Sequence, residues 1–229
     1  MSLFLNMNLL FRVVLMLVLA SVGAVSGAPP KYLKQVSKNL DRSDPIQVAI
    51  YQVLEGYPDF EAVLGAAYTQ EEQERFIEES LAKPDLMGFG KMQNLQILEA
   101  MAPTLRHVSL ELEGAKGLYY RQDSEQPAAA TKMKVVQWTY DVPLDEGQAF
   151  AHQLFSQVEA LLRKDKKWLK SGTEDKALSP LLGSLSKVYN LSLMGSELIM
   201  VNVDYPHTLE AKEALGLRLW VASMETKLK

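Results

Sequence analysis

The sequence predicts an α+β protein: an N-terminal helical layer followed by a largely antiparallel sheet (β-β-β-α-β-β-β), with one long helix packed on it. Two observations lead to this prediction. Apolar and polar residues alternate in residues 106–141 and again in residues 186–224, as they do in half-buried strands. Between these groups, residues 145–162 carry apolar side chains at helical spacing. Strands grouped on either side of a single helix favour an α+β architecture.

The clearest element is a hairpin over residues 186–205. One face of its first arm collects three apolar side chains, Tyr189, Leu191 and Leu193. The second arm, residues 198–203, is apolar at almost every position, which predicts a central strand covered on both faces. Gly195 and Ser196 suit a two-residue type II′ turn, because glycine accepts a positive φ at its first position.

Two helices of the N-terminal layer are predicted from their caps. Asp44 is placed to cap a helix whose first residue is Pro45. Thr69 and Glu72 form the pattern of a capping box, which predicts a second helix from there. Residues 58–67 and 91–102 predict two further helices, and the apolar stripe of the last one contains Met92, Leu95, Leu98 and Met101.

Four strands are predicted outside the hairpin, at residues 106–113, 117–122, 132–141 and 215–224. In the third, Trp138 and Tyr140 share one face, and Met133 and Val135 share the other. The polar stretches at residues 123–131 and 170–179 are predicted to be connections.

Composition excludes several classes of protein. The 229 residues carry a formal net charge of -4, which gives no basic face for a nucleic acid. The chain has no cysteine, so disulfides, thiolate zinc sites, iron–sulfur clusters and cysteine nucleophiles are excluded.

Residues 1–28 have the anatomy of a secretory signal peptide: Arg12, an unbroken apolar run at residues 13–19, and then small residues. Cleavage after Ser26 or after Ala28 fits this pattern, and a leader retained as a membrane anchor is the alternative. No twin arginine is present, so the general secretion route is expected. An exported chain without cysteine favours the bacterial periplasm or the extracellular space.

Three parts of the chain follow from these patterns. They are the signal peptide at residues 1–28, the helical layer at residues 29–103 and the sheet domain at residues 104–229. No linker of distinct composition separates the last two, so we expect them to share one core.

The densest charged feature is a basic run at the end of the long helix. It contains five cations and one tryptophan: Arg163, Lys164, Lys166, Lys167, Trp168 and Lys170. Cations at a helix C-terminus are favoured by the helix dipole, which is the structural explanation. The functional explanation is a partner-binding site for another protein or an anionic surface, in which the amphipathic Trp168 serves as an anchor. A membrane is a partner only if the leader is retained.

Motifs of catalysis and metal binding are absent from the sequence. His107, His152 and His207 show no ligand spacing, and no nucleophile elbow or H-E-x-x-H occurs. Glu111 and Glu113 would share one face of a predicted strand, as a glycosidase pair does, but solvated strand faces carry such acids routinely. No cofactor and no metal is expected.

The sequence therefore favours an exported, non-catalytic envelope protein that binds another macromolecule, such as an inhibitor, an immunity-type protein or an assembly factor. A periplasmic hydrolase is the alternative, and it requires a pocket that joins His152 or His207 to a serine and a carboxylate. An apolar patch with a polar rim would favour the binding protein. A membrane-associated envelope protein with an uncleaved leader is the second alternative.

Overall fold

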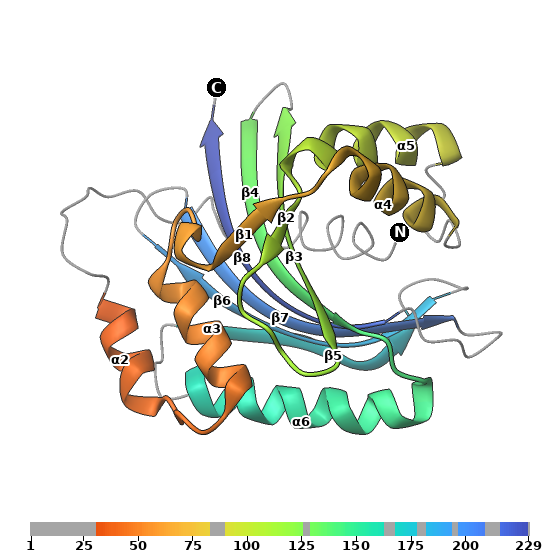
Figure 1. Ribbon diagram of the computed structural model, residues 1–229. Coiled ribbons are helices and arrows are strands. Elements are labelled where there is room, and N and C mark those ends of the chain that lie inside the picture. Colours follow the sequence, from red (N-terminus) through yellow and green to blue (C-terminus); the bar gives the residue numbers. More distant parts are fainter. Residues whose placement is uncertain are drawn as a thin grey trace.

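Eight antiparallel strands form one strongly curved sheet, and helices lie against both of its faces (Figure 1). The computed structural model describes residues 31–82, 90–125, 129–162, 168–177, 182–193, 197–208 and 216–228. The strand order is β1-β2-β3-β4-β8-β7-β6-β5. The predicted α+β class with a large antiparallel sheet and one long packed helix is confirmed.

The strands are β1 (Leu64–Ala67), β2 (Arg106–Val108), β3 (Ala115–Glu125), β4 (Ala129–Tyr140), β5 (Leu169–Ala177), β6 (Leu182–Ser192), β7 (Glu197–Thr208) and β8 (Leu217–Leu228). The helices are α2 (Lys31–Asn39), α3 (Pro45–Glu55), α4 (Gln70–Ala82), α5 (Gly90–Met101) and α6 (Leu144–Leu162), with 3₁₀ turns η1 (Glu61–Val63) and η2 (Ala102–Thr104). Within the described residues, no helix combines the length and the hydrophobicity needed to cross a membrane.

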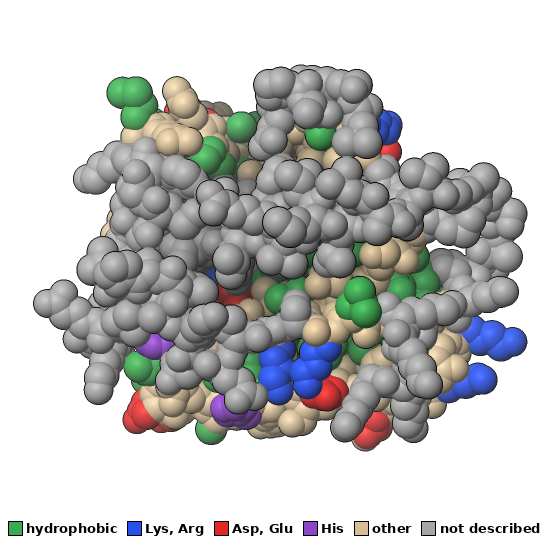
Figure 2. Space-filling model, turned by 180° about the vertical axis from the view of Figure 1, so that it is seen from behind, with side chains coloured by type: hydrophobic (Ala, Val, Ile, Leu, Met, Phe, Trp, Pro, Cys, Tyr) green, Lys and Arg blue, Asp and Glu red, His purple; other side chains and the backbone are tan. Residues whose placement is uncertain are grey.

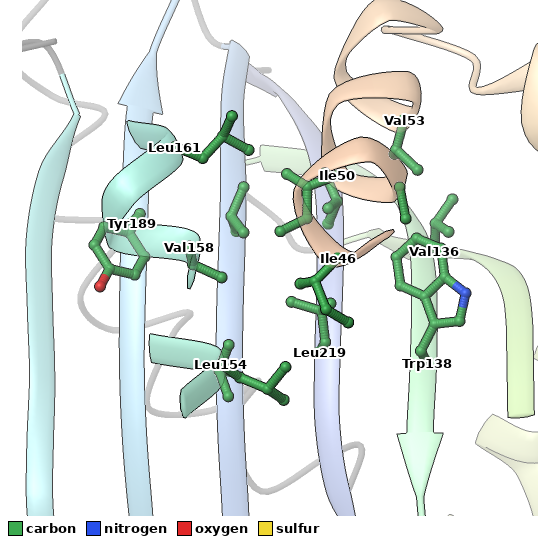
Figure 3. Packing of buried hydrophobic residues seen from close by; sticks show 14 of the residues in the cluster. Ile46, Ile50, Val53, Val136, Trp138, Leu154, Val158, Leu161, Tyr189 and Leu219 are labelled. Carbon is green, nitrogen blue, oxygen red and sulfur yellow. The ribbon is translucent and has the colours of Figure 1, made fainter. Parts of the chain in front are cut away.

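The larger core lies between the sheet and the helices α2, α3 and α6. Figure 3 shows side chains of α3 and α6 directed at the strands: Ile46, Ile50, Val53, Leu154, Val158 and Leu161. The whole apolar stripe predicted for the long helix is buried, namely Ala151, Leu154, Phe155, Val158, Leu161 and Leu162. Trp138 and Tyr140 reach this core from β4, on the common face that the sequence predicts.

The opposite face of the sheet carries a second core, covered by α4 and α5. Met133 and Val135 of β4 lie here, again as predicted, together with Leu98, Met101, Tyr120, Leu198, Met200, Trp220, Ala222 and Met224. The helices expected to form one layer are thus divided, because α2 and α3 pack on one face of the sheet and α4 and α5 on the other.

Both predicted helix caps are confirmed. The Asp44 carboxylate accepts hydrogen bonds from the backbone N–H groups of Ile46 at 2.9 Å and Gln47 at 3.3 Å. The backbone N–H of Thr69 donates to Glu72 Oε2 at 2.7 Å, and the N–H of Glu72 donates to Thr69 Oγ1 at 3.3 Å. The hydrogen bond from the Thr69 backbone also holds the pKa of the Glu72 carboxyl below its ordinary value.

The predicted hairpin is formed by β6 and β7, and β7 is covered on both faces. Its side chains Ile199, Val201 and Val203 lie in the larger core, and Leu198 and Met200 lie in the second core. The N–H of Leu193 donates to the carbonyl of Glu197 at 3.0 Å, next to the ends of the two arms. The turn predicted at Gly195 and Ser196 lies outside the described residues.

The two edge strands correct the sequence prediction. β5 occupies most of residues 170–179, which were predicted to be a polar connection. β1 occupies residues 64–67, where a helix was predicted, and only η1 is helical there. An edge strand pairs on one side only, and its backbone hydrogen bonds need no buried face, so its side chains show no alternation.

Three interior strands, β2, β3 and β4, also differ from the predicted strands in length. β2 ends at Val108 instead of continuing to residue 113. β3 and β4 remain paired as far as Glu125 and Ala130, so most of the connection predicted at residues 123–131 is strand. Here β4 is also paired with β8, and hydrogen bonding on both sides outweighs the weak strand preference of the polar residues.

Candidate functional site

A cavity of about 260 Å³ lies between α5 and β3. Its walls come from three segments: α5 contributes Gln96, Ile97, Ala100 and Met101, η2 contributes Thr104, and β3 contributes Arg121, Gln122 and Asp123. Ile97, Ala100 and Met101 make an apolar wall, and the other residues are polar. We refer to this cavity as the α5–β3 pocket.

Local structure explains why the pocket keeps its shape. Gln96, Ile97, Ala100 and Met101 lie on one side of α5, because residues four apart on a helix share a face. Thr104 then ties the end of this helix to β3. Its hydroxyl donates to the Met101 carbonyl at 2.8 Å and accepts from the Arg121 N–H at 2.9 Å.

Gln122 is one of the polar residues that line the pocket. Tyr120 of β3 packs with Leu98 and Met101 of α5, so Gln122, two residues further on, projects from the same face of the strand. Its Oε1 atom is buried and accepts no hydrogen bond from the described residues. The flanking Arg121 and Asp123 are joined to each other, with 2.8 Å between Nη2 and Oδ2. The pocket therefore combines an apolar wall with polar side chains, and Gln122 Oε1 is too buried to be reached from it.

The exposed side of α5 continues this surface. Met92, Gln96 and Ala100 are spaced four residues apart and lie along one side of the helix. Met92 was predicted to lie in the apolar stripe that packs in the core, but its side chain is 77% exposed. A flexible, polarizable side chain exposed beside a pocket is a common feature of binding surfaces.

The predicted partner-binding site is only partly described. Arg163, Lys164, Lys166 and Lys167 lie outside the described residues. Lys170 is exposed, and its ammonium lies 3.0 Å from a carboxylate oxygen of Glu159. On the face in Figure 2, the visible lysine and arginine side chains are scattered, and some lie next to acidic ones.

Trp168 corrects one part of that prediction. Its side chain is buried in the larger core, and its ring packs edge-on against Tyr32, with 6.4 Å between centroids. A buried indole packed in this way contributes to folding and is not available as the exposed anchor of a partner site. Trp168 follows the end of α6 and enters the core from the start of β5. Its sequence signal was the spacing of the α6 stripe, which Trp168 was expected to be able to continue.

A buried polar network lies on the α4–α5 side of the sheet, where β7 and β8 pair. Arg218 Nη2 donates a hydrogen bond to Asp204 Oδ2, and the indole N–H of Trp220 donates to Asp204 Oδ1 at 3.1 Å. The side chains of Arg218 and Asp204 are 4% and 0% exposed. The acid neutralises the charge of the guanidinium, as burial of both requires.

The three histidines lie on different elements. His107 of β2 lies 3.1 Å from the Glu72 carboxylate and stacks on Tyr68, His152 is exposed on α6, and His207 is buried at the end of β7. Among the described residues, no cluster of histidine and acidic side chains is suited to hold a metal ion. Glu111 and Glu113 follow the end of β2, so the spacing that they would have on a strand is not present.

Comparison with protein-family models, curated proteins and solved structures finds no match for this chain. Its function has therefore to be inferred from its own site. The residues of the α5–β3 pocket were not identified from the sequence, except for Met101 as a core position. The available signal was the weak amphipathic pattern of residues 91–102, which leaves one side of that helix without an apolar partner.

Proposed function

We propose that the mature chain is an exported, non-catalytic protein of the bacterial envelope that binds another protein through the α5–β3 pocket. The observation that carries this proposal is the pocket itself: an apolar wall with polar residues around it, continued along α5 by the exposed Met92. A pocket that accepts one anchoring side chain, with a flexible apolar side chain beside it, is how protein partners commonly engage.

Export is supported by the composition of residues 1–28, with an apolar run between Arg12 and a stretch of small residues. A partner in the envelope or outside the cell follows from that location. The basic run at residues 163–170 remains a second, electrostatic surface for the same partner or for an anionic one.

The test compares three forms of the tagged mature chain in affinity capture from native envelopes. Ala100→Phe places a ring in the pocket, and Ala149→Phe makes the same change at another exposed helical alanine, on α6. We expect a stoichiometric protein to be captured by the parent chain and by Ala149→Phe, and to be lost with Ala100→Phe. No stoichiometric partner, or equal capture by all three forms, would overturn the proposal.

A further inference from the structure

One edge of β3 is paired along only part of its length. β4 pairs with the whole of β3, from Ala115 to Glu125. On the other side β2 pairs with β3 only near Leu118 and Tyr119. Within the described residues, the stretch of β3 after Tyr119 is therefore an edge of the sheet, although β3 is an interior strand in the strand order.

The contacts of Thr104 show which backbone groups this edge presents. The N–H of Arg121 donates to Thr104 Oγ1 at 2.9 Å, and the Arg121 carbonyl oxygen lies 3.1 Å from the same hydroxyl. Arg121 thus directs both of its backbone groups away from β4. Because these groups alternate between the two edges of a strand, Asp123 and Glu125 also direct theirs outward, whereas the residues between them pair with β4.

The outward groups of Asp123 and Glu125 form the free part of this edge. No backbone hydrogen bond joins them to a described residue outside β4. The Asp123 side chain is 41% exposed, so solvent reaches this stretch of the strand. Two residues of an extended strand span about 7 Å, and another extended chain presents its own N–H and carbonyl groups at the same repeat. An unpaired edge of this kind is a template for strand addition.

The α5–β3 pocket lies along the same edge. Arg121, Gln122 and Asp123 all line it, although the side chains of successive strand residues point to opposite faces. Lining by three successive residues therefore places the pocket at the edge of the strand and not over one face. The helix α5, which lies beside this end of β3 (Figure 1), forms the opposite, apolar wall.

A strand added at this edge would direct every second side chain at α5. Tyr120 lies on the face of β3 that α5 covers, and Asp123 points to the other face. A residue paired with Asp123 projects on the same face as Asp123, so its two neighbours project towards α5. One of these neighbours meets the wall formed by Ile97, Ala100 and Met101, which favours an apolar side chain.

A second copy of this chain fits the edge poorly. The residues with free backbone groups are Asp123 and Glu125, so a symmetric pairing of two such edges sets acidic residues opposite acidic ones. Like charges directly opposite each other destabilise a strand pair. A segment of a different protein that lacks acidic residues at these positions meets no such repulsion.

From this geometry we infer that an extended segment of the partner protein adds to the sheet beside β3. It pairs with the outward backbone groups of Asp123 and Glu125 and places one apolar side chain in the α5–β3 pocket. The inference rests on the proposed function for the existence of a protein partner, and it adds the form in which that partner binds.

The first measurement is amide hydrogen exchange of the mature chain alone, followed by NMR. The amides of Gln122 and Ser124 face β4. Relative to their intrinsic rates, we expect them to exchange at least about fivefold more slowly than the amide of Asp123, a difference that corresponds to one hydrogen bond. Equal protection of the three amides would overturn the inference, because the edge would already be paired.

The second measurement uses a displayed library of random peptides selected on the mature chain. A selected peptide should protect the amide of Asp123 from exchange. It should bind Asp123→Pro at least about tenfold more weakly, because this change removes the outward N–H without removing a hydrogen bond to β4. The matched control Asp123→Ala keeps the N–H and should bind within about threefold of the parent. No selected peptide, or equal binding to both variants, would contradict strand addition.

Methylation of the peptide amides, one at a time, tests the same pairing without a variant chain. A strand pairs with one neighbour through every second residue, so methyl groups at alternate positions should abolish binding and those between them should not. Loss of binding at consecutive positions alike, or at none, would refute the inference.

Failure of this inference is distinguishable from failure of the proposed function. Capture that is lost with Ala100→Phe but kept with Asp123→Pro would retain the binding function and reject strand addition. Peptide binding at the edge, with capture unaffected by Ala100→Phe, would retain the edge as a peptide site and reject the proposed function. A dimer of the mature chain that Asp123→Pro dissociates would make a second copy the occupant and overturn the inference.

Discussion

Asp204→Asn tests whether the polar network between β7 and β8 is buried as the structure shows. The substitution removes the negative charge that pairs with Arg218 and keeps an oxygen that accepts from the indole of Trp220. Both partners of the ion pair are almost inaccessible, with side chains 4% and 0% exposed. The variant therefore leaves a buried guanidinium without its counter-charge, which costs about 3–5 kcal/mol.

Urea unfolding followed by circular dichroism measures this loss. With a denaturant dependence of about 1–3 kcal/mol per molar urea, we expect the midpoint to fall by about 1 M or more. The pair Lys227 and Glu225, also on β8 and 3.2 Å apart, is the matched control, because its side chains are 67% and 41% exposed. Lys227→Met should cost less than about 1 kcal/mol.

A double variant, Asp204→Leu with Arg218→Met, removes both charges and replaces them with apolar groups. It should recover most of the stability that Asp204→Asn loses, because the large cost comes from one unpaired charge rather than from loss of the pair. The reasoning is refuted if Asp204→Asn shifts the midpoint no more than Lys227→Met does. Such a result would mean that water reaches Arg218 in the folded protein.

Four further predictions concern other parts of the chain. Val201→Asp should destabilise the protein by more than about 3 kcal/mol, since it buries an unpaired charge in the central strand, and a variant that melts like the parent would contradict that assignment. Burial raises the pKa of Tyr205 to about 12, above the ordinary value of about 10, so its contribution to stability is complete below pH 10 and is lost as the pH rises towards 12. Phenolate absorbance and loss of the circular dichroism signal should then rise together, and ionisation near pH 10 with an intact sheet would refute this. Intact-mass measurement of exported protein should place the mature N-terminus near Gly27, and a full-length chain that stays with salt-washed membranes would show a retained leader. The last variant replaces three lysines of the basic run by glutamine, namely Lys164, Lys166 and Lys167. It should lose less than about 1 kcal/mol of stability for each residue and should capture less of the partner at low salt. Unchanged capture would disprove this effect.

The elements that the sequence predicted correctly are those whose signal is contained within a few neighbouring residues. The stripe of α6, the two-sided burial of β7 and the caps at Asp44 and Thr69 each depend on spacing of two to four positions. Such spacing reports which face of an element is apolar. It does not report which other element covers that face.

Contacts between distant residues decided the rest. β5 has no strand pattern of its own and is held by its pairing with β6. Trp168 is a core residue because Tyr32 packs against it, more than a hundred positions earlier in the chain. The α5–β3 pocket exists because Thr104 ties α5 to β3 beside a glutamine whose oxygen remains without a donor. By itself the sequence determined a largely antiparallel sheet with one long helix packed on it, since local periodicity selects the elements. Only the tertiary structure decided where the site lies, because a pocket arises from the way separate elements meet.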